Sequence, residues 1–252
     1  MGQSFKKLYT NKRDFIAYKE QIYHKNKKSL LWFGGLNSDM SGTKAQYLSN
    51  FSKKNRINFF RFDYFGHGRS SKEFNNCVVS DWLNNGIKIM DQIIDNEVIL
   101  IGSSMGGWIS TLVSLKRRKK VKGLILIAPA LDMTENLMWK KFSMKEKKLI
   151  KSRGYIERYV EDYDSSYRIT KKLIEDGRKH LILNDIIDLN VPIRIFHGIK
   201  DEAVPWELSL DLMSCFSSDD INVSFNKDGN HSLSSASDLK SLGDTILDVY
   251  NN

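Results

Sequence analysis

The sequence has few cysteines and prolines and no long apolar run. Of its 252 residues, two are Cys and three are Pro. Cys77 and Cys215 lie far apart and in no metal-binding or redox spacing, so we expect two reduced thiols and no structural disulfide. No stretch approaches the roughly 18 uninterrupted apolar residues of a membrane-spanning helix, and we therefore expect no stable membrane anchor.

Two further absences concern targeting and charge. The first residues lack the apolar core of a secretory signal, and Lys6 occupies a position where an acylation signal has Ser or Thr, so we expect a cytoplasmic protein. Acidic residues are fewer than basic ones, 30 against 39. The basic excess lies in the first thirty residues and in the run Lys116–Lys120, neither of which forms a recognisable nucleic-acid-binding motif. These charges predict a solvated surface, with no nucleic-acid partner.

Apolar residues make up 41% of the chain and occur in short runs that alternate with helical patterns. This alternation is typical of the α/β class, with a mostly parallel central sheet and helices on both faces. Because the motifs described below extend over nearly the whole length, we expect one domain, residues 1–252. The predicted core strands are Ser29–Phe33, Ile57–Phe62, Val98–Ile101, Val121–Ile127, Pro192–Phe196 and Ile221–Asn226.

The segment from about residue 132 to residue 190 breaks this rhythm. It is too long for a connection between adjacent elements and reads as several charged amphipathic helices with no intervening strand. We interpret it as an inserted helical lid. Its apolar side chains suit either an acyl chain or packing of the lid on the core, and the sequence does not separate the two; they are Leu137, Met138, Trp139, Phe142 and Met144.

A candidate nucleophile lies after the predicted strand Val98–Ile101. In the run Gly102-Ser103-Ser104-Met105-Gly106, small residues stand two before and two after Ser104, as a sharp turn between a strand and a helix requires. Ser103 is one position out of register with the two glycines. The pattern therefore predicts Ser104 as the nucleophile of a serine hydrolase.

A serine nucleophile needs an imidazole to take its proton and an acid to orient that imidazole. His231 follows the last predicted strand, and Asp201 follows a buried strand before it. The order serine, acid, histidine is the one found in α/β-hydrolases. We predict Asp201 as the acid and His231 as the base, with Glu202 and Asp132 as alternative acids.

Backbone donors for an oxyanion are predicted in two places. The Met105 N–H lies beside Ser104 at the start of a helix. The second donor should come from the loop after an early strand, where Gly34-Gly35-Leu36 permits close backbone approach. We predict the Leu36 N–H as this donor.

Several of these runs resemble the α/β-hydrolase family. They are Arg61–Ser70, Gly102–Trp108, and His197-Gly198 through Asp201 to Trp206. Within the family, they and the run Asn37–Ala45 look like the mitochondrial α/β-hydrolase-domain proteins that act as palmitoyl-protein thioesterases and acyl-glucuronide esterases, with their bacterial relatives. The chain departs from many relatives by having Gly34-Gly35 where they have His-Gly.

The resemblance implies the same site residues: Ser104, Asp201 and His231, with Leu36 and Met105 at the oxyanion positions. It implies that Asp63 and the turn Gly66–Gly68 are structural. We expect hydrolysis of carboxylic esters or thioesters, including long-chain acyl thioesters, with a small-molecule or acylated substrate, no cofactor and no metal. We expect a monomer or weak homo-oligomer. Peptide or carbon–carbon bond cleavage by the same residues, and a catalytically silent binding module, remain alternatives.

Overall fold

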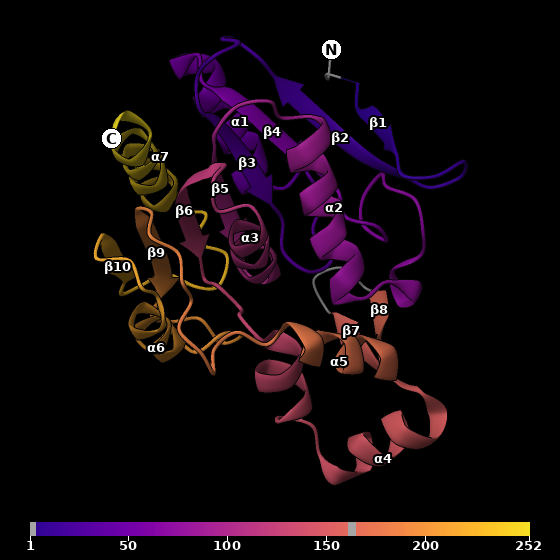
Figure 1. The fold of residues 1–252 in the computed structure, drawn as a ribbon. Coiled ribbons are helices and arrows are strands. Elements are labelled where there is room, and N and C mark those ends of the chain that lie inside the picture. The colour runs from indigo at the N-terminus through magenta and orange to yellow at the C-terminus, as the bar shows by residue number, and fades with distance from the viewer. Residues whose placement is uncertain (1–3, 161–164) are drawn as a thin grey trace.

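The computed structural model describes residues 4–160 and 165–252. Its centre is an eight-stranded sheet with the order β1-β2-β4-β3-β5-β6-β9-β10 (Figure 1). The strands from β4 to β10 in this order pair in parallel, whereas β1 and β2 form an antiparallel entry. The strands are β1 (Lys6–Tyr9), β2 (Phe15–Gln21), β3 (Ser29–Phe33), β4 (Asn58–Phe62), β5 (Val98–Ser103), β6 (Val121–Ile127), β9 (Ile193–Gly198) and β10 (Ile221–Asn226).

Helices cover both faces of this sheet (Figure 1). Alternate residues of a strand point to opposite faces: Leu31 and Phe33 of β3 pack in the same core cluster as α2 and α3, whereas Leu30 and Trp32 pack with α1 and α7. The mostly parallel sheet between two helical layers is therefore confirmed. The elements are α1 (Thr43–Asn55), η1 (Phe74–Asn76), α2 (Val79–Gln92), α3 (Met105–Lys116), α6 (Glu207–Cys215) and α7 (Ala236–Asn251).

The inserted segment differs from its prediction. Besides η2 (Thr134–Trp139), α4 (Met144–Arg153), α5 (Lys171–Gly177) and η4 (Arg178–His180), it contains an antiparallel pair of strands, β7 (Tyr155–Val160) and β8 (Ser165–Thr170). The prediction of helices without a strand at 132–190 was thus wrong. Ile156 and Ile169 pair across the two strands and are both buried, while their chain neighbours Glu157 and Arg168 are exposed. The two-residue period of a half-buried strand is obscured in β7, because Arg158 occupies the position two residues after Ile156 where the next apolar residue would stand.

Two other predictions concern the chain as a whole. Cys77 and Cys215 are both free. In residues 4–160 and 165–252, no helix combines the length and apolar character that crossing a membrane requires.

Candidate active site

Ser104 lies at the sharp turn between β5 and α3. Its backbone has φ 54° and ψ −121°, a conformation outside the regions that L-residues ordinarily adopt. A Cβ on Gly102 would lie 2.3 Å from the Gly106 carbonyl oxygen, and a Cβ on Gly106 would lie 2.1 Å from that of Phe33. Only glycine fits at both positions, and the close contact of strand and helix leaves Ser104 at the carboxyl edge of the sheet.

His231 lies in the loop after β10 and links the other two predicted side chains. Its Nε2 is 3.1 Å from Ser104 Oγ, and its Nδ1 is 2.7 Å from Asp201 Oδ2. An ionised carboxylate can only accept hydrogen bonds, so Nδ1 carries the proton and Nε2 accepts from the serine hydroxyl. The structure therefore joins Ser104, His231 and Asp201, from the loops after β5, β10 and β9, in one hydrogen-bonded chain.

Asp201 is buried, and its carboxylate accepts several hydrogen bonds. Its Oδ1 accepts hydrogen bonds from the backbone N–H groups of Ala203 and Val204, each at 2.9 Å. Burial alone raises the pKa of this carboxyl, but the hydrogen bonds from His197, His231 and Val204 outweigh that effect and hold the pKa well below its usual value. The carboxylate is therefore ionised throughout the physiological pH range.

His197 is a second imidazole on the same carboxylate. It is fully buried at the end of β9, with Nε2 3.1 Å from Asp201 Oδ2 and 3.0 Å from the Val204 carbonyl oxygen. Its Nδ1 lies 2.6 Å from Ser209 Oγ. Both partners of Nε2 are acceptors, so Nε2 donates and Nδ1 accepts from the Ser209 hydroxyl. No pattern in the sequence indicated this bond between His197 and Asp201.

The two alternative acids, Asp132 and Glu202, do not take the place of Asp201. Asp132 is buried and accepts hydrogen bonds from the backbone N–H groups of Ile182 and Leu183. Glu202 is exposed beside Asp201. The hydrogen bond to His231 Nδ1 comes from Asp201, not from either alternative.

The loop after β3 brings its backbone close to Ser104. A Cβ on Gly35 would lie 3.4 Å from Ser104 Cβ, and the Gly35 carbonyl accepts a hydrogen bond from Ser38 N–H, which closes a turn. Leu36 lines the same groove as Ser104. Met105 is the first residue of α3, where an N–H has no partner within the helix. Their oxyanion roles stay predictions.

The groove beside Ser104 has a volume of about 320 Å³ and a mainly polar wall, which includes Ser38, Thr43, Lys44 and Ser234. The apolar side chains named above for the predicted lid do not line it. Met138 and Phe142 are buried in the core, and Met144 is 72% exposed. For Met138 and Phe142, packing on the core is thus the interpretation that the structure favours.

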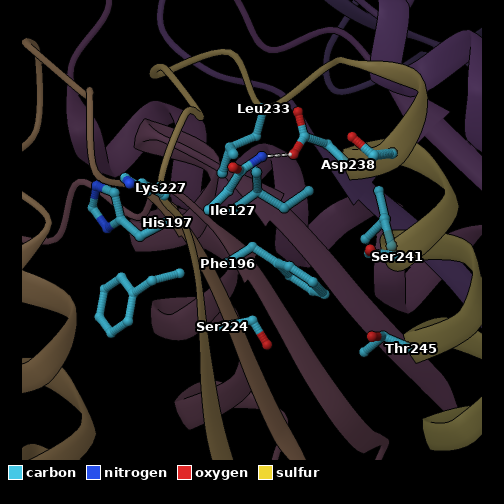
Figure 2. Close-up of a pocket in the computed structure, with 13 residues that line it drawn as sticks. Ile127, Phe196, His197, Ser224, Lys227, Leu233, Asp238, Ser241 and Thr245 are labelled. Atoms are coloured by element: carbon cyan, nitrogen blue, oxygen red, sulfur yellow. Dashed lines mark hydrogen bonds between the residues drawn. The ribbon is translucent and has the colours of Figure 1, made fainter.

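A second pocket, of about 430 Å³, lies between the ends of β9 and β10 and helix α7 (Figure 2). It reaches His197 and Leu233, but its wall includes none of Ser104, Asp201 and His231. We therefore do not assign it to the chemistry at Ser104. Within the described ranges, no group of three or more His, Cys, Asp or Glu side chains is placed to hold a metal ion.

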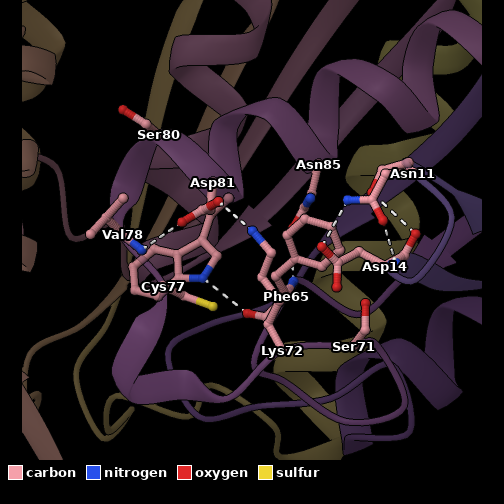
Figure 3. A network of polar contacts seen from close by, with 12 residues as sticks. Asn11, Asp14, Phe65, Ser71, Lys72, Cys77, Val78, Ser80, Asp81 and Asn85 are labelled. Atoms are coloured by element: carbon pink, nitrogen blue, oxygen red, sulfur yellow. Dashed lines mark hydrogen bonds and ion pairs between the residues drawn. The ribbon is translucent and has the colours of Figure 1, made fainter.

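The turn Gly66–Gly68 supports the site from a distance. Asp63 Oδ1 accepts a hydrogen bond from the Met40 N–H at 2.7 Å, in the loop that borders the groove. A Cβ on Gly68, where φ is 47°, would lie 2.3 Å from Asp63 Oδ2. Directly before the turn, the Phe65 N–H donates a hydrogen bond to the Asn85 side chain of α2 at 2.7 Å (Figure 3). These bonds fix the groove's border to α2.

Comparison with known proteins finds a matching sequence family and similar proteins that cover most of the chain. Residues 24–238 match the sequence family described as serine aminopeptidase, S33. The chain is 33% identical over 241 residues to the mitochondrial palmitoyl-protein thioesterase ABHD10 of Rattus norvegicus, an alignment that covers 93% of this chain and 78% of that protein.

Two solved structures are similar over almost the whole chain. The α/β-hydrolase domain-containing protein 10 from mouse has a TM-score of 0.89 at 30% identity and covers 99% of both chains. The crystal structure of an inferred hydrolase from Agrobacterium vitis S4 has a TM-score of 0.92 at 30% identity, covering 98% of this chain and 97% of that one.

Proposed function

The chain belongs to the serine aminopeptidase S33 family and has the α/β-hydrolase fold, and on this premise we propose that it hydrolyses carboxylic ester or thioester bonds through an acyl-enzyme on Ser104. The observation that carries the proposal is the hydrogen-bonded chain from Ser104 Oγ through His231 to Asp201. The preference for esters and thioesters rests on relatives named as thioesterases.

The proposed reaction has two halves. Ser104 Oγ attacks the substrate carbonyl while His231 Nε2 takes its proton, and His231 then returns the proton to the leaving alcohol or thiol. Asp201 holds the Nδ1 proton and stabilises the imidazolium. The N–H groups of Leu36 and Met105 stabilise the oxyanion. Water activated by His231 then releases the acid and restores the serine.

We also propose that the segment 132–190 is a lid belonging to the single domain of residues 1–252. In support, Ser166 and Tyr167 of β8 line a pocket of about 530 Å³ together with Asn37, Ser38 and Asp39. Ser38 and Asp39 also border the groove at Ser104. Residues of the proposed lid and of the loop that carries the proposed oxyanion donor therefore line the same pocket. A substrate larger than the Ser104 groove would extend toward it, as a long-chain acyl thioester requires.

A cytoplasmic location remains part of the proposal. The two free cysteines fit a reducing compartment, whereas the relatives with thioesterase names are mitochondrial proteins. Activity-based labelling of fractionated cells would locate the protein. Recovery from an organelle or a secreted fraction would contradict the proposal.

The test of the chemistry is covalent labelling by a fluorophosphonate, which reacts with an activated serine. The wild-type protein should be labelled, and Ser104→Ala and His231→Ala should not. Labelling that survives Ser104→Ala would contradict the assignment. A panel of p-nitrophenyl esters and acyl thioesters of rising chain length then identifies the substrate class, with preference for long acyl chains expected. Activity restricted to peptide amides would instead favour the aminopeptidase chemistry that the family description names.

A further inference from the structure

Lys44 connects two loops that are distant in sequence. It lies in the first turn of α1, and its Nζ contacts the carbonyl oxygen of Ser232 and lies 3.4 Å from Ser234 Oγ. Ser232 directly follows His231. Lys44 also forms part of the wall of the groove that contains Ser104 and His231. One ammonium group therefore links helix α1 to the loop that carries the proposed base.

Other contacts also hold this loop: His231 Nδ1 is bonded to Asp201, and the Ser234 hydroxyl donates to the Ser232 carbonyl at 2.9 Å. Leu233 is buried in the core with a φ of 43°, and Figure 2 shows it beside Asp238 at the start of α7. The Ser232 N–H donates to Asn230 Oδ1 at 3.0 Å, a bond within the loop. Ser232 itself is exposed. The Lys44 bond is charge-assisted, which makes it about twice as strong as a neutral hydrogen bond, and it fixes the loop from the groove side.

We propose that Lys44 is a positioning residue that holds the His231 loop against α1, so that the imidazole stays within hydrogen-bond distance of Ser104. The inference rests on the proposed function of Ser104 and His231. Reaction rates at such a site are sensitive to geometry, because a misplacement of about 1 Å can cost 100-fold. Lys44 does not contact the reacting atoms and acts through the Ser232 carbonyl.

The charge on Lys44 is itself sensitive to pH. Burial lowers its pKa from 10.5 to about 8, and Asp238 of α7 partly opposes that effect. Asp39 and His231 are the other titratable groups on the wall of its groove. Lys44 is therefore mainly charged at neutral pH and loses its proton near pH 8. Because the neutral amine is a weaker donor to the Ser232 carbonyl, the positioning role predicts a decline in reactivity with a midpoint near pH 8.

The test compares fluorophosphonate labelling rates of wild type, Lys44→Met, Lys44→Gln and Lys53→Met. Lys53 is an exposed lysine on the same helix and serves as the matched control. We expect labelling to slow by about 10- to 100-fold in Lys44→Met, by analogy with other small misplacements, and to stay unchanged in Lys53→Met. Lys44→Gln keeps a donor without the charge, so it should be intermediate and should lose the decline near pH 8.

The outcomes separate this inference from the proposed function. If both Lys44 variants are labelled at the wild-type rate, the positioning role is wrong while the role of Ser104 stands. If wild type is not labelled, or Ser104→Ala is, the proposed function itself fails. A decline that persists near pH 8 in Lys44→Gln would also overturn the role of Lys44. Circular dichroism of each variant confirms folding, and Lys44→Gln remains informative if Lys44→Met does not fold.

Discussion

His197 contacts Asp201 from inside the fold, with its Nε2 3.1 Å from the same carboxylate oxygen that accepts from His231. Asp201 is thus held by one imidazole that faces the groove and one that is fully buried. Removing the buried donor should raise the pKa of Asp201, because a hydrogen bond to the charged form favours that form.

We predict that His197→Phe destabilises the protein by about 1–3 kcal/mol, the range for leaving a buried polar group without its partner. Thermal and urea denaturation measure this loss. Ser209→Ala, which removes only the hydroxyl on His197 Nδ1, should cost less, about 1 kcal/mol. Equal stability of His197→Phe and wild type would contradict the role given to His197.

Asp201→Asn should leave the fold intact and lower kcat/KM by about 10³- to 10⁴-fold, as expected when the orienting carboxylate of such a site is replaced by an amide. The amide can no longer hold the proton on His231 Nδ1. Ester hydrolysis at saturating and limiting substrate measures the effect, with Glu202→Gln as the exposed neighbouring control. A larger effect of Glu202→Gln would reverse the assignment of the acid.

Alanine substitutions at two glycines near Ser104 should have different effects, one on folding and the other on reactivity. Gly106→Ala should not yield folded protein, because the new Cβ would lie 2.1 Å from the Phe33 carbonyl oxygen. Gly35→Ala should fold, since its Cβ would lie 3.4 Å from Ser104 Cβ, but the methyl group narrows the space beside the serine. Expression, circular dichroism and labelling rates distinguish the two. A folded, fully reactive Gly106→Ala would refute the packing of the turn.

The buried imidazole of His67 should make the stability of the folded protein depend on pH. Burial lowers its pKa from 6.5 to about 4, opposed by the hydrogen bond from Nδ1 to the Phe65 carbonyl oxygen. The unfolded chain therefore binds the proton more readily between these values, so stability is lost as pH falls from 6.5 toward 4, by up to about 3 kcal/mol. Urea denaturation at pH 7 and at pH 4.5 measures the loss, which should be smaller in His67→Phe. If wild type and His67→Phe lose the same free energy of unfolding between pH 7 and pH 4.5, His67 is not the cause of the pH dependence.

The sequence predicted the sheet and the positions of the site's three main side chains because both depend on local patterns. Apolar runs identify the buried strands, and Gly102 and Gly106 define the turn at Ser104. The contacts of Lys44 with Ser232 and of His197 with Ser209 carry no such pattern, since they depend on how distant elements pack. The strands β7 and β8 were missed for a different reason, because Arg158 interrupts the apolar side of β7 on which Ile156 pairs with Ile169.

The placement of His231 after the last strand has a consequence for the order of synthesis. Ser104 leaves the ribosome 127 residues before His231, and β10 is at the edge of the sheet. A nascent chain that ends before β10 thus contains Ser104 without the proposed base. On the proposed roles of Ser104 and His231, reactivity arises only when the strand β10 has docked, so a single covalent label would report that the chain has folded as far as His231.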